Sequence, residues 1–367
     1  MNSKKNKAFG KIISQIISGN SLNEKDAYEA FSYILRDEVT EMQQGAFLAA
    51  LTAKKETEAE IAGGWRAIFE LDTNKVTTIH RSEIVENCGT GMDSFKTFNI
   101  STAAAIVAAS GGVKMARHGA RAITSSCGTI DMAEALGVDI DCPVGLVASS
   151  IEASGIGLFN GMSSATHPAA LGRILSRIHF GSPLNIAASL ANPAHPIKAV
   201  RGVYRREMME PVINVMQQIG YKNALVVHGI ITKFDACIDE ASVCGPTYCL
   251  HLIDGKIEEF CLSPTEVGLR FHDPKSIAAP RDILTSVNNI ISLLSGQGCE
   301  AAADIVALNT ALIFVVAEIV PTLREGVEMA KDIISKGTAL QTLEKWVISQ
   351  NRDPEKGRRT LYSILKN

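Results

Sequence analysis

A glycine-rich loop that runs directly into a helix start is the segment of this chain best suited to hold phosphate. Residues 88–102 read Cys-Gly-Thr-Gly-Met-Asp-Ser-Phe-Lys-Thr-Phe-Asn-Ile-Ser-Thr, and an alanine-rich helical pattern follows. Gly89 and Gly91 can adopt positive φ and let the backbone approach a ligand closely. We expect a helix beginning near Ala103, with side-chain oxygens beside its free amides from Asn99, Ser101 and Thr102. The pattern predicts a phosphate-binding loop, and an ordinary capped helix after a loop is the alternative.

Basic and hydroxyl side chains form a second cluster. Residues 117–121 read Arg-His-Gly-Ala-Arg, and residues 124–129 read Thr-Ser-Ser-Cys-Gly-Thr. Guanidinium groups hold phosphate with two hydrogen bonds at once, and serine hydroxyls add neutral donors. The loop therefore suits phosphate oxygens, and a solvated polar loop is the alternative.

Two adjacent carboxylates, Asp239 and Glu240, follow a probable strand that ends at His228-Gly229. Mg²⁺ favours one or two protein carboxylates together with phosphate oxygens and water, so this pair would suit a Mg²⁺–diphosphate substrate. We expect both carboxylates to face solvent, and an ordinary solvated surface pair is the alternative.

A fourth cluster, residues 163–169, reads Ser-Ser-Ala-Thr-His-Pro-Ala, and Arg177 follows on an expected helix. This arginine could face the carboxylate of a second substrate. His167 as a satisfied core histidine and Arg177 as a surface charge are the alternative.

The pattern of the first 70 residues predicts a compact unit of three or four helices. Residues 21–24 and 57–60 each fit the capping box that begins a helix, and apolar residues over 42–51 recur at helical spacing. From Glu83 onwards, short β-branched or apolar runs alternate with helical stretches, which is typical of a mainly parallel sheet flanked by helices. We therefore expect an α/β protein with a helical domain at 1–78 and a larger domain at 79–367.

Two of the expected strands, at Ile84-Val85 and at 225–227, precede the richest loops. Ligands gather at the carboxyl ends of such strands. Residues 249–260 contain Asp-Gly at 254–255 between two apolar runs, which predicts a hairpin.

Composition excludes several classes of protein. The formal net charge of −3 offers no global basic surface for nucleic acid or an anionic membrane. The eight cysteines are scattered without Cys-x-x-Cys pairs, so we interpret them as reduced core thiols rather than zinc ligands. The longest apolar stretch, 311–317, is too short to span a bilayer, and we expect a cytoplasmic location.

Taken together, the four clusters resemble the anthranilate phosphoribosyltransferase family, over nearly the whole chain. The family motif Gly-Thr-Gly-Gly-Asp followed by Asn-x-Ser-Thr is matched without a gap from Gly89 to Thr102, with Met92 as the departure. The opening helices resemble the small helical domain through which family members dimerise. Further similar stretches are 131–137, 192–194, 309–311 and 324–326.

The resemblance implies Mg²⁺-dependent transfer of the 5-phosphoribosyl group from phosphoribosyl pyrophosphate to the amine of anthranilate, a step of tryptophan biosynthesis. No side-chain nucleophile is implied, and the expected assembly is a homodimer without nucleic-acid or membrane partners. The implied ligands of Mg²⁺ are Ser101, Asp239 and Glu240. The implied donor-binding residues are Gly89, Met92, Asp93, Thr97, Asn99, Ile100, Ser101, Thr102, Arg117, Ser125 and Thr129. The implied acceptor-binding residues are Gly89, His118, Ala120, His167 and Arg177.

The departures from the family pattern fall mostly on the acceptor side. The family usually has Lys-His-Gly-Asn-Arg at 117–121, so Ala120 lacks an amide that normally touches the acceptor. Met92 replaces a glycine whose small size lets the backbone approach the diphosphate. Ala188-Ser189 stands where the family usually has Gly-Pro.

Three alternatives remain open at the level of sequence. The same transfer could use another aromatic amine or a nitrogen heterocycle as acceptor. A pyrimidine-nucleoside phosphorylase shares this architecture but has less need of a metal. A relative without catalytic activity could use the fold as a binding module, for example for nucleic acid.

Overall fold

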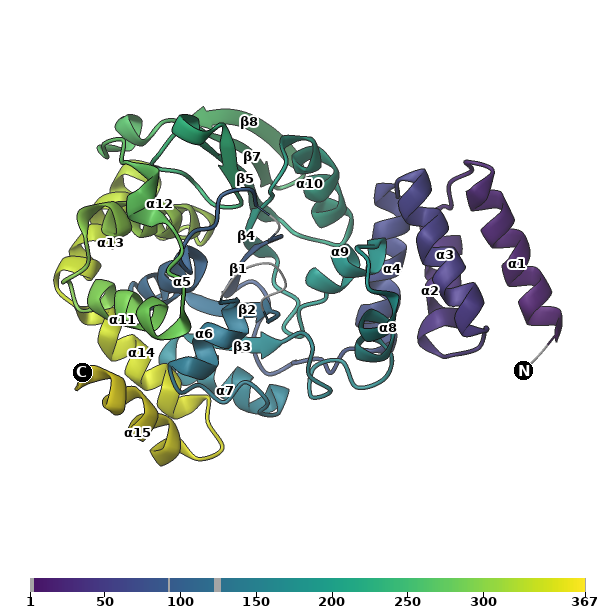
Figure 1. Cartoon of the computed structure of the whole chain (residues 1–367), viewed down its shortest axis with the longest axis horizontal. Coiled ribbons are helices and arrows are strands. Elements are labelled where there is room, and N and C mark those ends of the chain that lie inside the picture. The colour runs from purple at the N-terminus through teal and green to yellow at the C-terminus, as the bar shows by residue number, and fades with distance from the viewer. Residues whose placement is uncertain (1–2, 92, 122–126, 367) are drawn as a thin grey trace.

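A computed structural model describes residues 3–91, 93–121 and 127–366 and divides into a helical part and an α/β part (Figure 1). The helical part projects from one side of the molecule and carries the N-terminus. Within the described ranges, no helix combines the length and the apolar character needed to cross a bilayer.

Four helices open the chain, as the sequence predicts: α1 (Ser3–Ile17), α2 (Glu24–Leu35), α3 (Glu41–Lys54) and α4 (Glu58–Leu71). The capping box at α4 is confirmed, because Glu60 N donates to Thr57 Oγ1 at 3.3 Å and Thr57 N donates to Glu60 Oε2 at 2.8 Å. The box expected at 21–24 is wrong. The residue that caps α2 is Asn23, whose side chain accepts a hydrogen bond from Asp26 N at 2.9 Å.

Two later helices join the helical part: α8 (Leu171–Ile178) and α9 (Pro183–Ser189) lie beside α4 in Figure 1. Buried apolar residues of α1 to α4, α8 and α9 share one core with α10 (Met209–Gln218) and one face of the sheet. Two separate stretches of the chain therefore contribute to the helical part, which the chain leaves after Leu71 and rejoins at Leu171.

A mainly parallel sheet forms the centre of the α/β part, in the order β3-β2-β1-β4-β5-β7-β8, with β6 paired to β5. Strands β1 to β5 run parallel, whereas β6, β7 and β8 pair antiparallel. The hairpin expected at 249–260 is confirmed as β7 and β8. The strands are β1 (Ile84–Gly89), β2 (Lys114–Gly119), β3 (Ile156–Asn160), β4 (Lys198–Gly202), β5 (Asn223–Ile231), β6 (Ala236–Ile238), β7 (Thr247–Ile253) and β8 (Lys256–Leu262).

Alternating side chains of the strands pack into two separate hydrophobic cores, one on each face of the sheet. In β4, Val200 packs into the core formed with α5 and α12, whereas its neighbour Ala199 packs towards the helical part. Successive residues of a strand point to opposite faces, so helices cover both sides of the sheet. The remaining helices are α5 (Ile100–Ser110), α6 (Thr129–Ala135), α7 (Val144–Ser154), α11 (Ile283–Leu294), α12 (Glu300–Val316), α13 (Leu323–Ser335), α14 (Thr338–Ser349) and α15 (Pro354–Leu365). Short 3₁₀ turns lie at Arg206–Met208, Thr232–Phe234, Pro264–Val267 and Pro274–Ile277.

Two further expectations need correction. Helix α5 begins at Ile100 rather than near Ala103, and Asn99 makes no capping bond; its Nδ2 instead donates to Cys127 O at 3.2 Å. All eight cysteines are free thiols, as expected, but Cys261 and Cys299 are exposed and so are not part of the core.

Candidate active site

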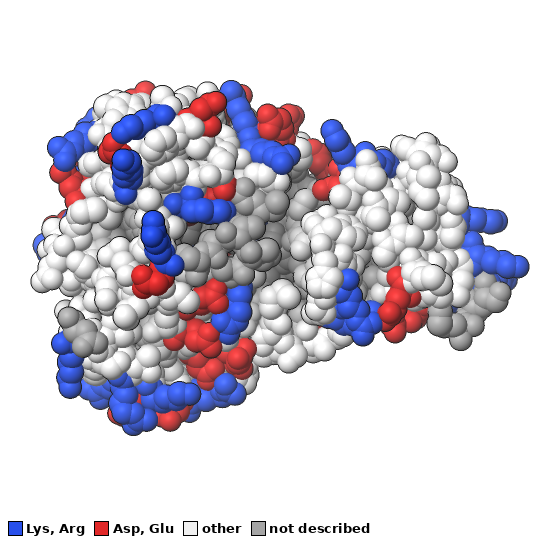
Figure 2. Space-filling model, in the orientation of Figure 1, with Lys and Arg blue, Asp and Glu red and all other residues white. Residues whose placement is uncertain are grey.

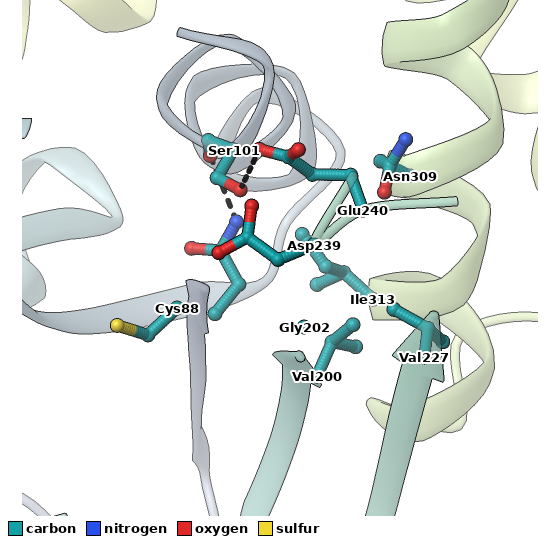
Figure 3. Close-up of a pocket in the computed structure, with 10 residues that line it drawn as sticks. Cys88, Ser101, Val200, Gly202, Val227, Asp239, Glu240, Asn309 and Ile313 are labelled. Carbon is teal, nitrogen blue, oxygen red and sulfur yellow. Dashed lines mark hydrogen bonds between the residues drawn. The ribbon is translucent and has the colours of Figure 1, made fainter. Parts of the chain in front are cut away.

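The carboxyl ends of three neighbouring strands, β1, β4 and β5, meet the start of α5 at a small pocket (Figure 3). This is the edge of the sheet where parallel strands present ligand-binding loops. The pocket is lined by Asn87, Cys88, Ser101, Val200, Gly202, Val227, Asp239, Glu240, Asn309 and Ile313.

The hydroxyl and the two acids singled out by sequence come together in this pocket. Ser101 Oγ donates to Glu240 Oε1 at 3.1 Å, and Gly91 N donates to Asp239 Oδ2 at 2.6 Å. Across the described residues, Glu240 Oε2 is buried without any hydrogen-bond partner. Helix α5, the glycine loop and the segment that carries Asp239 and Glu240, here called the acidic segment, therefore converge on one point.

Three glycines make room for the acidic segment as it crosses the strand ends. A Cβ atom at Gly89 would lie 2.2 Å from Asp239 Oδ2, one at Gly202 would lie 1.4 Å from Asp239 O, and one at Gly229 would lie 2.2 Å from Glu240 O. No side chain fits at such distances, so glycine is required for this crossing. The expectation that both carboxylates face solvent is wrong, because Asp239 is 7% exposed.

Two buried carboxyl groups share this pocket with Asp93 nearby, and their ionised forms are disfavoured there. Burial, then the neighbouring charges of Asp239 and Asp93, raise the pKa of Glu240 well above its usual value. Burial and Asp93 likewise raise the pKa of Asp239. A divalent cation would relieve both effects, and the orphaned Glu240 oxygen and the Ser101 hydroxyl are oxygen donors of the kind that Mg²⁺ prefers.

The described residues contain no group of three or more His, Cys, Asp or Glu side chains arranged to hold a metal ion by themselves. Mg²⁺ usually takes only one or two protein carboxylates and completes its shell with phosphate oxygens and water. The residues present therefore fit a metal that arrives with a phosphorylated substrate.

Of the predicted donor residues, Ser101 lines the pocket and Asp93 is close enough for its charge to act on both acids. Asp93 Oδ1 accepts from Lys96 Nζ at 3.0 Å, and Thr97 pairs with Ala278 in an isolated bridge. Ile100 is fully buried, so its backbone, not its side chain, is what it can offer a ligand. Thr129 is the first residue of α6. Met92 and Ser125 lie outside the described residues.

The two guanidinium groups of the second cluster are separated. Arg117 is buried beneath the first turn of α5, where its Nη1 donates to Thr102 Oγ1 and its Nε to Asn87 Oδ1, both at 2.9 Å. Burial lowers the pKa of Arg117 to about 10. Arg121 instead pairs with Asp131 and Glu134 on α6. The Arg117 guanidinium and the Thr102 hydroxyl are thus hydrogen-bonded to each other in this structure.

Two buried histidines lie side by side, His118 on β2 and His167 in the segment between β3 and α8. The rings of His118 and His167 are 5.5 Å apart, and Nε2 of each is buried with no partner among the described residues. His167 Nδ1 lies 2.7 Å from the carbonyl oxygen of Asp72 and must donate to it, so its neutral Nε2 is a bare lone pair. Burial lowers the pKa of both rings, that of His118 to about 3.

Asp72, just past the end of α4, holds the His167 loop to the helical part. Its carboxylate accepts from the amides of Ala169, Ala170 and Leu171 at 2.6 to 2.9 Å, which anchors the start of α8. The same residue therefore fixes both the ring orientation of His167 and the position of α8. Asp72 carries no motif in the sequence that would reveal this role.

The geometry agrees with what comparison with known proteins shows. Residues 81–340 match a family model described as "Glycosyl transferase family, a/b domain", and residues 10–71 match "Glycosyl transferase family, helical bundle domain". The anthranilate phosphoribosyltransferase of Methanothermobacter thermautotrophicus is 33% identical over 343 residues, covering 92% of this chain and 97% of that protein. That of Symbiobacterium thermophilum is 36% identical over 342 residues, covering 91% and 95%.

The chain belongs to the anthranilate phosphoribosyltransferase family. The family resemblance, the fold class and the enzyme class predicted from sequence are thereby confirmed.

Solved structures of anthranilate phosphoribosyltransferases have the same fold. That of the Thermus thermophilus protein superposes with a TM-score of 0.82 at 31% identity, covering 92% of this chain and 98% of that one. A Saccharomyces cerevisiae anthranilate phosphoribosyltransferase in complex with PRPP and Mg superposes with a TM-score of 0.80 at 24% identity, covering 94% and 98%. The second likeness concerns the fold alone.

Two departures from the family pattern, at Ala120 and at 188–189, have visible structural consequences. Ala120 is exposed and offers no polar side chain. Ser189 receives two hydrogen bonds from the buried Arg201 of β4, at 2.8 Å to its carbonyl oxygen and 3.2 Å to its hydroxyl. The altered 188–189 segment is therefore tied to a buried cation.

Arg177 does not lie with the two histidines in this structure. It sits in the last turn of α8, more than half exposed, and its Nη1 pairs with Glu41 Oε1 of α3. An acceptor carboxylate would have to draw it away from Glu41.

Sequence reasoning missed the polar residue that braces the acidic segment. Asn309 stands out in the sequence only as part of a stretch similar to the family, yet it lines the pocket from α12. An amide within a run of mostly apolar helical residues needs a hydrogen-bond partner, and that signal is present in the sequence.

Proposed function

We propose that this protein transfers the 5-phosphoribosyl group of phosphoribosyl pyrophosphate to the amine of anthranilate, with Mg²⁺, and releases pyrophosphate. The observation that carries the proposal is the convergence of Ser101, Asp239 and Glu240 at the strand ends, where Glu240 keeps a buried, unpartnered oxygen. Family membership supports the same reaction class. The step would serve tryptophan biosynthesis.

Donor binding is assigned to the glycine loop and the start of α5. Asp239 and Glu240 would hold Mg²⁺ together with Ser101, and bound Mg²⁺ would neutralise charge on the departing diphosphate. The ribosyl C1 becomes cationic as the diphosphate leaves, so positioning and charge stabilisation supply the catalysis and no side-chain nucleophile is needed.

Acceptor binding is assigned to the pair His118 and His167. The two Nε2 atoms are buried, lie on neighbouring rings and have no partner among the described residues, and a neutral imidazole can meet an amine hydrogen or nitrogen at such an atom. Because burial lowers the pKa of both rings, they are neutral near pH 7 and do not repel the cationic ribosyl carbon, and His167 Nε2 is free to accept a hydrogen bond from the amine.

A second candidate is the same transfer to a different aromatic amine or nitrogen heterocycle. Ala120 and the Arg201–Ser189 pair favour it, since both fall on the proposed acceptor side while Ser101, Asp239 and Glu240 are kept.

The test is pyrophosphate release by the purified protein with phosphoribosyl pyrophosphate and Mg²⁺, with and without each acceptor. Release with anthranilate supports the first candidate. Release only with another amine or heterocycle would replace the acceptor and keep the reaction class. Metal-independent, phosphate-dependent cleavage of thymidine or uridine would instead identify a pyrimidine-nucleoside phosphorylase.

Nucleic acid is not proposed as a partner. Acidic and basic side chains are interspersed over the face shown in Figure 2, in keeping with the net charge of −3. Tight, steeply salt-dependent binding of nucleic acid without donor binding would support a non-catalytic relative instead.

We further propose a homodimer formed through the helical domain, in the cytoplasm. Large apolar side chains are exposed on two of its helices, Ile17 at 71% at the end of α1 and Met42 at 84% on α3. Exposed residues of this kind mark an interface only where they form one patch, so the proposal rests on the resemblance of these helices to the domain through which family members dimerise. Light scattering after size exclusion would measure the mass, and a monomer would contradict the proposal.

A further inference from the structure

The side-chain amide of Asn309 forms a two-point contact with the backbone of Ala241. Ala241 N donates to Asn309 Oδ1 and Asn309 Nδ2 donates to Ala241 O, both at 2.9 Å. Nδ2 also donates to Ile305 O at 2.9 Å, within the same helix. Asn309 is 6% exposed and lies on α12, which packs across the face of the sheet. The amide thus imitates a strand partner for one residue of the acidic segment.

The acidic segment needs such a partner because it leaves the sheet before the two acids. Strand β6 ends at Ile238, so Asp239 and Glu240 lie beyond its ladder. On the far side of Ala241, the next residue is fixed by Ser242 N donating to Thr247 Oγ1 at 2.9 Å. Asn309 holds the one residue that separates Glu240 from that anchor.

We propose that Asn309 is a positioning residue for the Mg²⁺–diphosphate site, which fixes the backbone of Ala241 and so directs the Glu240 carboxylate at Ser101. The proposal rests on the function proposed above for Ser101, Asp239 and Glu240. It assigns Asn309 no contact with the reacting atoms.

An amide is the side chain this position requires. One backbone donor and one backbone acceptor must be satisfied together, and only a group with both functions in one plane does so. A carboxylate would lose the bond to Ala241 O and would add negative charge beside Asp239 and Glu240. An alanine would leave both polar groups of the Ala241 backbone without the partners they have now.

The neighbouring Thr310 is a matched control. It is fully buried on the same helix, and its Oγ1 bonds Val306 O at 2.8 Å and Ala104 O at 3.4 Å, away from the acidic segment. Thr310→Val removes a buried hydrogen bond from α12 without touching Ala241. It therefore reports the effect of losing buried hydrogen bonds of α12, within the helix and to α5, while Ala241 keeps both of its partners.

The experiment measures binding of Mn²⁺, as a probe for Mg²⁺, to the folded protein in the presence of inorganic pyrophosphate, by electron paramagnetic resonance. We expect Asn309→Ala to weaken Mn²⁺ binding by about 10-fold or more, in the range found when groups that orient metal ligands are removed. Thr310→Val should bind Mn²⁺ as the wild type does. In turnover, Asn309→Ala should raise the half-saturating Mg²⁺ concentration and leave KM for the acceptor unchanged.

The outcomes separate this inference from the proposed function. If the wild type fails to bind Mn²⁺ with pyrophosphate, the proposed function falls and this inference falls with it. If the wild type binds and folded Asn309→Ala binds equally well, only the inference is overturned. The inference is also overturned if Thr310→Val weakens binding as much as Asn309→Ala. Asn309→Ser, which keeps one small polar group, provides the second variant for the same measurement should the alanine variant unfold.

Discussion

The carbonyl oxygen of Asp239 occupies the space that a side chain on Gly202 would need. A Cβ atom there would lie 1.4 Å from that oxygen. Gly202 is the last residue of β4, and its register partner on β1 is Gly89, which makes room for the Asp239 carboxylate. Two glycines on adjacent strands thus allow Asp239 to pack directly against the ends of β1 and β4.

Gly202→Ala should therefore displace Asp239 and reduce turnover by a factor of about 100 or more, because a small misplacement of a catalytic group carries a cost of this size. Pyrophosphate release measures the effect, and the melting temperature shows whether the fold survives. Gly145→Ala, in the first turn of α7 with open space around the position, should leave turnover unchanged. Wild-type turnover in Gly202→Ala would show that the acidic segment is not held where the structure has it.

The combined change Asp239→Asn and Glu240→Gln should abolish most turnover and keep the fold. Loss of both carboxylates removes the charges proposed to bind Mg²⁺, so turnover should fall by at least about 100-fold. The melting temperature should not fall, since two amides of the same shape replace two acids whose raised pKa values mark an unfavourable burial of charge. Circular dichroism with thermal melting tests the second half. An unfolded variant would identify the pair as structural.

The sequence predicted the elements of this site more completely than their contacts. The Gly89 to Thr102 loop, the Ser101 hydroxyl and the Asp239-Glu240 pair were all identifiable, because residue type and spacing along the chain carry that information. That Asp239 would be buried was not, because its burial arises from three glycines on three different strands. Arg117 illustrates the same limit: its partners Asn87 and Thr102 are known only once α5 is laid across β1 and β2.

The fold shows a comparable division. The parallel strands, the β7–β8 hairpin and the opening helices each follow from a local sequence pattern, and the structure contains all of them. The docking of α8 and α9 beside α4 depends on tertiary contacts such as Asp72 with the amides of 169–171 and Trp65 Nε1 donating to Leu190 O at 2.9 Å. These contacts join residues about a hundred or more positions apart, and the hydrophobic periodicity of a single helix or strand carries no information about them.

His118 should make the protein less stable in acid. Its pKa is lowered from 6.5 to about 3, by burial first and then by the charges of His167 and Arg201, so the unfolded chain takes up a proton before the folded one. The stability that neutral His118 permits is therefore present above pH 6.5 and is lost as the pH falls from there towards 3. At about pH 5 the loss amounts to about 2 kcal/mol.

Denaturant unfolding of the wild type and of His118→Gln, at neutral pH and at about pH 5, measures this loss of unfolding free energy. The wild type should lose about 2 kcal/mol more than the variant between the two conditions. An equal loss in both proteins would mean that His118 is protonated in the folded state as readily as in the unfolded chain.

Arg177 and Glu41 provide a test of the acceptor site from opposite sides. Arg177→Ala should raise KM for the acceptor and leave KM for phosphoribosyl pyrophosphate unchanged, because the arginine is assigned to the acceptor carboxylate. Glu41→Gln should lower KM for the acceptor, since it removes the group that now holds Arg177. The ion pair is exposed at both ends and worth about 0.2 to 1 kcal/mol, so the improvement should not exceed about fivefold.

Arg173, one turn earlier on α8, is the control for this pair of variants. Its guanidinium bonds Gln44 Oε1 and Ile34 O in the helical part, both at 3.2 Å, so Arg173→Ala should affect stability but neither KM. A rise in acceptor KM for Arg173→Ala equal to that of Arg177→Ala would show that α8 acts through its packing. Equal losses of donor and acceptor affinity in Arg177→Ala would remove the arginine from the acceptor site, since a group that meets only the acceptor carboxylate has no means of weakening the donor.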